Sequence, residues 1–266
     1  MTFRTVVDIP KPGFLIEPLE KLLFVGSCFA DSIGKRFAEE HFPVVVNPFG
    51  VMYNPASVLH TLHRWEGEIP RIVFITLGTN HVYRLRSTGE IVDNCQKRPQ
   101  NLFEEEELTV EECTEYLVQA IDELQNRRSD VQVVVTVSPI RYAKYGYHKS
   151  QLSKAVLLLA VDRLCGLKTC VSYFPAYEIV MDELRDYRFY QPDMLHPSAQ
   201  TVEYIWERLY ELYLSPLAKQ FVQDWKPIKA ALGHQPFCPE SEEYKAFLIQ
   251  TQEKERALLA YYNNNV

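Results

Sequence analysis

The sequence has few cysteines and lacks any long apolar run. Its six cysteines are spread thinly over 266 residues, with no CxxC pair and no histidine at zinc-finger spacing. This pattern is typical of free thiols in a reducing compartment and argues against a structural zinc. Nowhere do 18 uncharged apolar residues follow one another, and residues 1–12 lack the apolar core of a signal peptide. We therefore expect a cytoplasmic protein without a membrane span.

Low-complexity segments and a concentrated basic stripe are also missing. Apolar residues make up 47% and charged residues 24% of the chain, which is typical of a folded globular protein. The net charge is -7, and basic residues form only short clusters such as Arg84/Arg86 and Arg127/Arg128. Because a nucleic-acid-binding surface concentrates positive charge, we expect neither nucleic acid nor a membrane as a partner. The oligomeric state stays open.

Five short, β-rich apolar runs alternate with helical segments. The runs occupy residues 22–25, 44–46, 72–77, 131–137 and 169–174. Apolar strands separated by helices are typical of a parallel sheet covered on both faces, and the crossovers between such strands are right-handed. The sequence therefore predicts a doubly wound, three-layer α/β/α fold with about five parallel strands.

Helical patterns fill the segments between these runs. Thr109 and Glu112 form a Thr-x-x-Glu capping box that opens an amphipathic helix ending near Arg127. Further helices are expected over residues 29–41, 150–164 and 198–213, and the 150–164 segment has apolar residues near helical spacing at Leu152, Val156, Leu159 and Leu164.

The chain is expected to divide near residue 214. Residues 1–214 hold the α/β pattern, whereas residues 215–266 read as a helical extension packed on the same domain or on a partner. Its buried or partner-facing positions are predicted to be Phe221, Trp225, Phe247, Leu258 and Tyr261.

Polar residues follow the predicted strands at the edge of the sheet where open parallel sheets bind ligands. Ser27 follows the first strand, Gly50 the second and Asn80 the third, while Asp193 and His196 lie in an irregular segment after the fifth. A serine hydroxyl needs an adjacent base to act as a nucleophile, and the base needs a group that fixes its tautomer. Ser27, His196 and Asp193 have the side chains for these three roles.

Acyl transfer also requires hydrogen-bond donors for the negative oxygen of the tetrahedral intermediate. The candidates are the backbone N–H of Ser27 at a helix start, the N–H of Gly50 and the side-chain amide of Asn80. This chemistry requires no metal and no organic cofactor.

The residues around Ser27 carry a family resemblance. Gly26-Ser27-Cys28-Phe29-Ala30 reads GSCFA, and the sequence resembles the GSCFA-domain family, which is similar to a branch of the SGNH/GDSL hydrolases. Further similar stretches, spanning roughly residues 20–210, are Asn47-Pro-Phe-Gly50, Tyr53-Asn-Pro55, Thr76-Leu-Gly78, Asn94-Cys-Gln-Lys97, Thr136-Val-Ser-Pro139, Ser153-Lys-Ala155 and Asp193-Met-Leu-His196-Pro-Ser198.

The resemblance implies a flavodoxin-like SGNH fold and a catalytic set. The four letters of the SGNH name correspond to Ser27, Gly50, Asn80 and His196, with Asp193 as the partner of the histidine. It implies an esterase or deacylase that forms an acyl-serine and removes a small acyl group, such as acetyl, from a carbohydrate or a similar polar scaffold. The superfamily usually begins with Gly-Asp-Ser, whereas here Gly26 directly precedes Ser27.

Simpler structural interpretations stay open for these residues. Ser27 could serve only as a helix N-cap, Gly50 only as a turn residue, and Asp193 and His196 only as a surface ion pair before a helix that begins near Pro197. Cys28 is the competing nucleophile, because a thiolate near a helix N-terminus is reactive.

Other residues and functions also have alternatives. Asn94 and Lys97 could reach the pocket or belong to a loop, and Tyr142, Tyr145 and Tyr147 could line an acceptor groove or pack within a loop. The histidines outside the catalytic set, including His81 beside Asn80, have no metal-binding spacing. Two alternative functions remain, an O-acyltransferase of the same fold and a non-catalytic binding module.

Overall fold

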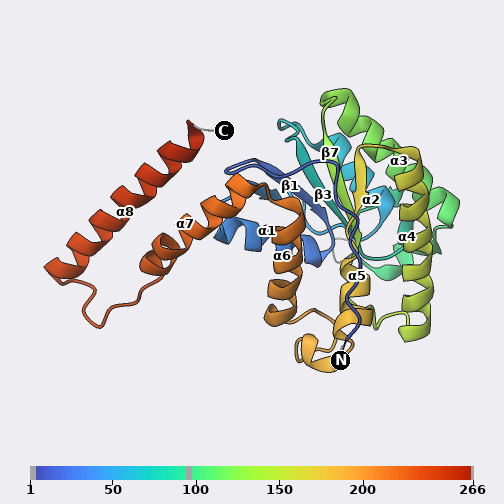
Figure 1. Ribbon diagram of the computed structural model, residues 1–266. Helices are drawn as coiled ribbons and strands as arrows, with labels where there is room; N and C mark the ends of the chain where they lie inside the picture. The colour runs from blue at the N-terminus through green and yellow to red at the C-terminus, as the bar shows by residue number, and fades with distance from the viewer. Residues whose placement is uncertain (1–3, 94–97, 265–266) are drawn as a thin grey trace.

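A five-stranded parallel sheet forms the centre of the protein (Figure 1). The computed structural model describes residues 4–93 and 98–264. The parallel strands are β1 (Leu22–Gly26), β2 (Val44–Val46), β3 (Ile72–Leu77), β7 (Gln132–Val137) and β8 (Val171–Tyr173). Their spatial order, β2-β1-β3-β7-β8, is the flavodoxin-like order when only these five strands are counted. The predicted fold class and all five predicted strands are confirmed.

Helices cover both faces of this sheet and create two cores. Because side chains alternate along a strand, Leu23 and Val25 pack with α2 (Pro55–Arg64), α3 (Val110–Arg127) and α4 (Tyr147–Leu167). Leu22 and Phe24 point the other way and pack with α1 (Cys28–Glu39) and α6 (Ala199–Tyr213). All residues of β1 are buried, as expected for a strand at the centre of three layers.

The helix boundaries largely follow the predicted ones. Thr109 and Glu112 form the expected reciprocal capping box at the start of α3. α4 is longer than predicted, and its leucine spacing does not mark its buried face, since Leu152 and Leu159 are exposed. The helix is apolar on several sides, and it packs instead through a face that includes Ser153, Lys154 and Ala160.

Residues 174–198 connect β8 to α6 through short helical turns and loops. They include α5 (Ala176–Glu178), the π-helix η2 (Ile179–Leu184) and the 3-10 helix η3 (Tyr187–Phe189). Ser198 caps α6 by accepting a hydrogen bond from the Thr201 N–H. The 193–196 segment lies in this stretch outside any helix or strand.

A second, antiparallel sheet lies between β3 and α3, and the sequence did not predict it. Its strands are β4 (His81–Leu85), β5 (Ile91–Val92) and β6 (Phe103–Glu107), with the 3-10 helix η1 (Gln100–Leu102) before β6. In β6 only Phe103 is buried, and four glutamates follow it. Ion pairs such as Arg84–Glu106 connect the strands across this exposed sheet. Because these strands lack apolar runs, hydrophobic patterning does not predict them.

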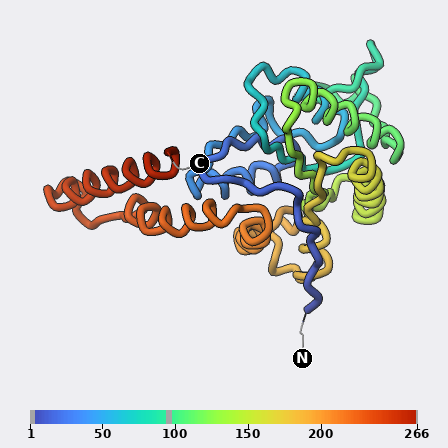
Figure 2. Tube along the Cα trace, turned by 45° about the horizontal axis from the view of Figure 1, so that its top comes forward, coloured from blue at the N-terminus to red at the C-terminus, as the bar shows by residue number. Residues whose placement is uncertain are grey.

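The C-terminal segment forms a helical hairpin that extends away from the sheet (Figures 1 and 2). It consists of α7 (Pro216–Leu232) and α8 (Glu242–Asn263). Phe221 and Trp225 are buried as predicted, and Leu258 is partly buried against the same core. Phe247 and Tyr261 are exposed, so for these two only the predicted partner-facing role stays open. The buried aromatic residue of α8 is Tyr262, which packs on Phe221 and donates a hydrogen bond to Asp224. No helix within the described residues combines the length and the apolar run needed to cross a bilayer.

Candidate functional site

Ser27 lies at the carboxyl end of β1 and is fully buried. Its hydroxyl caps α1 by accepting a hydrogen bond from the Phe29 N–H at 3.3 Å, and it lies 3.0 Å from the Thr76 hydroxyl of β3. Its own N–H donates to the Thr76 carbonyl at 2.9 Å. The side chain is therefore held between the helix start and the neighbouring strand, with 0% of its surface exposed.

Gly26 sets the turn before Ser27. Its φ is +141°, and a Cβ atom at this position would lie 2.1 Å from the Thr76 carbonyl oxygen. The Asn47 side chain accepts a hydrogen bond from the Gly26 N–H at 2.8 Å and donates one to Asp31 at 2.7 Å. Only glycine fits here, because a side chain would push β1 away from β3.

Cys28, the first residue of α1, is more accessible than Ser27. It is half-buried, and its Sγ lies 3.7 Å from the Tyr53 hydroxyl. Burial and the nearby Cys28 raise the pKa of Tyr53 to about 12, so this phenol remains a neutral hydrogen-bond partner at physiological pH.

Asp193 and His196 form a carboxylate–imidazole pair. Asp193 Oδ2 lies 2.6 Å from His196 Nδ1, while Oδ1 accepts hydrogen bonds from the N–H groups of Leu195 and His196 at 2.8 and 3.0 Å. These bonds, led by the one from the His196 N–H, lower the pKa of Asp193 to about 2. The ionised carboxylate thus fixes the imidazole orientation and leaves Nε2 for a second partner.

Arg141 attaches the Asp193–His196 loop to the sheet. This residue follows β7, and its backbone N–H donates to the Leu195 carbonyl at 3.0 Å while Nη1 donates to the Met194 carbonyl at 2.9 Å. Since β7 is paired with β3, and β3 contacts Ser27, the loop and Ser27 share the carboxyl edge of the sheet. Among the described residues, no hydrogen bond joins Ser27 to His196.

The predicted oxyanion donors already have acceptors. Gly50 has φ +93°, and its N–H closes a turn onto the Asn47 carbonyl at 2.8 Å. Asn80 is buried, and its side-chain amide donates to the Leu108 carbonyl at 2.7 Å. Together with the bond from the Ser27 N–H to Thr76, this means that an oxyanion would have to replace or share the acceptors of the two backbone N–H groups, whereas the Asn80 amide has a second N–H beyond the one bonded to Leu108.

Lys154 is a buried cation beside this edge that the catalytic assignment omitted. Its ammonium donates to the Gly78 and Ser138 carbonyls, both at 2.7 Å. These bonds connect the segments that follow β3 and β7. Burial lowers its pKa to about 7. Its place in Ser153-Lys-Ala155 and its position three residues before the buried Leu157 were the available sequence signals.

We predict that the contribution of Lys154 to the unfolding free energy increases as the pH rises above 7. Its folded pKa lies below the ordinary 10.5, so between about pH 7 and 10 this lysine binds more protons in the unfolded chain than in the folded one. Its contribution to the unfolding free energy therefore rises with pH, by at most about 1.4 kcal/mol per pH unit. Urea unfolding of the native protein and of Lys154→Met at pH 7 and 9 measures this effect. The unfolding free energy of the native protein minus that of Lys154→Met should be larger at pH 9 than at pH 7. An equal difference at both pH values would contradict the lowered pKa of Lys154.

The remaining sequence candidates have mixed outcomes. The His81 ring stacks on Tyr145 at 3.7 Å, and Tyr142 packs edge-on against Tyr53, whereas Tyr147 is exposed. Asn94 and Lys97 lie outside the described residues. Within residues 4–93 and 98–264, no three His, Cys, Asp or Glu side chains gather in a way that could hold a metal ion.

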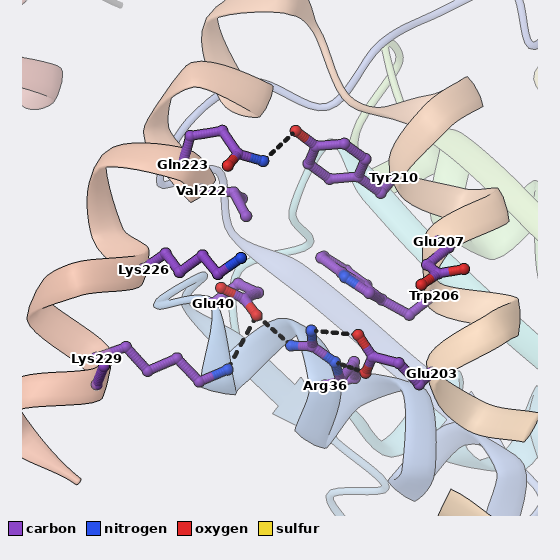
Figure 3. A pocket seen from close by; sticks show the side chains of 11 residues that line it. Arg36, Glu40, Glu203, Trp206, Glu207, Tyr210, Val222, Gln223, Lys226 and Lys229 are labelled. Atoms are coloured by element: carbon purple, nitrogen blue, oxygen red, sulfur yellow. Dashed lines mark hydrogen bonds and ion pairs between the residues drawn. The ribbon is translucent and has the colours of Figure 1, made fainter. Parts of the chain in front are cut away.

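A cavity of about 480 Å³ lies away from this edge, between α1, α6 and α7 (Figure 3). Four of its charged side chains form one network, in which Arg36 binds Glu203 and Glu40, and Glu40 also binds Lys229 at 2.9 Å. Arg36 and Glu40 come from the last turn and C-cap of α1, whereas Ser27 precedes its first turn. We therefore associate this cavity with the junction of α7 and not with the reaction.

Comparisons with known proteins match one family. The GSCFA family model matches residues 21–71 and 66–209, and a second model, described as GSCFA domain protein, C-terminal domain, matches residues 225–266. No curated protein matches significantly.

Solved structures resemble the chain only distantly. A carbohydrate esterase family 3 protein from Talaromyces cellulolyticus is 11% identical, with 77% of this chain and 99% of that chain covered and a TM-score of 0.43. A member of the lipolytic protein G-D-S-L family from Veillonella parvula is 11% identical, with 73% and 97% covered and a TM-score of 0.46. These likenesses are too remote to bear on the reaction.

Proposed function

The chain belongs to the GSCFA family, and from that premise we propose that it is an esterase that works through a covalent acyl-enzyme. The observation that supports this proposal is the Asp193–His196 pair, 2.6 Å apart, on a loop attached to the carboxyl end of β7. A carboxylate bonded to Nδ1 selects the tautomer whose Nε2 accepts a proton. Such a pair is suited to general-base chemistry.

In the proposed reaction Ser27 is the nucleophile. His196 takes the proton of the Ser27 hydroxyl as the oxygen attacks the ester carbonyl, and later activates the water that releases the acyl group. Asp193 stabilises the imidazolium. The hydroxyl must first turn from Thr76 toward His196, and the N–H groups of Ser27 and Gly50 and the Asn80 amide must turn to the oxyanion.

A second nucleophile is favoured by a specific observation. Cys28 is partly exposed, whereas Ser27 is completely covered. Its thiol lies in the first turn of α1, directly after Ser27. Transfer of the acyl group to Cys28 would use the same histidine and give a thioester intermediate.

The proposed substrate is a small acyl ester, such as an acetyl ester, of a carbohydrate or a similar polar alcohol. An O-acyltransferase would share every step up to the acyl-enzyme and differ only in the acceptor. A product assay with an acetyl ester, with and without added sugar, distinguishes the two, since a hydrolase releases acetate in both cases and a transferase acetylates the sugar.

Hydrolysis of 4-nitrophenyl acetate by matched variants tests the proposal. If Ser27 is the nucleophile, Ser27→Ala should lower the rate by at least about 10³-fold while Cys28→Ala retains most activity. The opposite result would assign the reaction to Cys28. An inert native protein would contradict the esterase and favour a binding module.

A further inference from the structure

A cavity of about 260 Å³ lies beside the His196 loop. Arg141 and Tyr190 line it on the side of the loop, and the remaining lining residues are Gln151, Val180, Met181, Arg185, Asp186 and Tyr187. Arg141 donates to the carbonyls of Met194 and Leu195. Tyr190 forms an antiparallel bridge with Pro197, the residue after His196. The cavity therefore adjoins the backbone on both sides of the proposed base.

The charge of this cavity is positive. Its two cations are Arg141 and Arg185, and its one acid is Asp186. The Asp186 carboxylate is bound to Arg188, since it accepts hydrogen bonds from the backbone N–H and the Nη2 of that residue at 2.8 and 2.9 Å. In a chain with a net charge of -7, two guanidinium groups around one cavity would attract an anion.

Both guanidinium groups have capacity left for a ligand. Arg141 uses Nη1 for Met194, and among the described residues none of its other side-chain N–H groups has a hydrogen-bond acceptor. Its position is fixed by Tyr147, whose ring centre lies 4.2 Å from the guanidinium carbon. Arg185 is 72% exposed, and its nearest carboxylate, on Asp182, is 3.8 Å away, which is a weak, solvent-screened pair.

Tyr187 and Tyr190 add aromatic surface to the cavity beside Arg141. Their ring centres lie 5.7 and 5.5 Å from the Arg141 guanidinium carbon. Guanidinium groups bind carboxylates with two parallel hydrogen bonds, and aromatic side chains are a common lining for the body of a small ligand. This combination fits a ring that bears a carboxylate.

We propose that this cavity binds a carboxylate on the alcohol part of the ester substrate, as in an acylated sugar acid. The inference rests on the proposed esterase function and specifies its substrate class. The alcohol part is the better occupant because the cavity is larger than a small acyl group requires. The carboxylate would pair with Arg141 and Arg185 while the ester bond reaches His196.

Paired ligands test this proposal. 4-Acetoxybenzoate carries a carboxylate on its alcohol part, and its methyl ester is the neutral match. The native protein should show a kcat/KM at least about tenfold higher for the charged ester, and Arg185→Gln and Arg141→Gln should each reduce this ratio several-fold. Arg163→Gln is the matched control, because it removes an exposed charge twelve residues beyond Gln151 on α4 and should keep the native ratio. Equal kcat/KM values for the two esters in the native protein, or the same loss of preference in Arg163→Gln, would overturn the proposal.

Direct binding separates this inference from the reaction itself. Calorimetric titration should show that 4-hydroxybenzoate binds at least about tenfold more tightly than methyl 4-hydroxybenzoate, and that Arg185→Gln removes most of the difference. If neither ester is hydrolysed but this difference is found, the esterase proposal fails and the carboxylate site stands. If the two phenols bind equally well, the site is refuted even in an active enzyme.

Discussion

Replacing His196 by alanine is expected to lower kcat/KM for 4-nitrophenyl acetate by at least about 10³-fold. In the proposed mechanism the imidazole is the base for either nucleophile, so the expected loss does not depend on the choice between Ser27 and Cys28. Its removal should also leave the fold intact, since the side chain is partly exposed and its side-chain partner is Asp193. Steady-state kinetics and thermal unfolding of the variant measure both effects.

Asp193→Asn provides the matched test of orientation. The amide keeps the size of the carboxylate, but its NH₂ group can donate to Nδ1 and so favour the wrong tautomer, with a comparable loss of activity expected. A His196→Ala variant that folds and retains more than a tenth of the native kcat/KM would show that the pair is only a surface interaction.

Gly26→Ala is expected to destabilise the protein by about 3 kcal/mol or more, from backbone strain and overpacking together. The added Cβ would lie 2.1 Å from the Thr76 carbonyl oxygen, and the φ of +141° is unfavourable for alanine. The same change would disturb the hydrogen bonds between Ser27 and Thr76. Urea unfolding should therefore show a lower midpoint, with activity reduced as well.

Gly13→Ala is the control for the glycine substitution. Nothing lies within 4 Å of a Cβ atom at this position, and its φ is not positive, so the unfolding free energy should stay within about 0.5 kcal/mol of the native value. Equal stability of Gly26→Ala and Gly13→Ala would contradict the close contact between β1 and β3 described above.

The fold was predictable because its central strands are continuous apolar runs. A short run such as 72–77, rich in β-branched residues and buried at every position, is typical of a strand inside a sheet covered on both faces. The β4–β6 sheet gave no such signal, since it is stabilised by charged cross-strand pairs such as Arg84–Glu106. Likewise, α4 is apolar on several sides, so the spacing of Leu152 and Leu159 could not identify its buried face.

For the candidate site, sequence reasoning identified residue types but not their hydrogen-bond partners. The Asp-x-x-His spacing was sufficient to predict a carboxylate–imidazole pair, because both side chains belong to one short loop. By contrast, the bonds from Ser27 to Thr76 and from Asn80 to Leu108 connect residues distant in the sequence. The roles of Arg141 and Lys154 as donors to backbone carbonyls likewise depend on how β3, β7 and the His196 loop approach one another.

Mass mapping after treatment with a fluorophosphonate tests the central claim most directly. This reagent phosphonylates a hydroxyl only when a neighbouring base activates it, so the adduct reports the convergence of residues 27 and 196. We predict a single adduct on Ser27 in the native protein and none in His196→Ala. An unlabelled Ser27 in the folded native protein would contradict the assignment of this serine as the nucleophile.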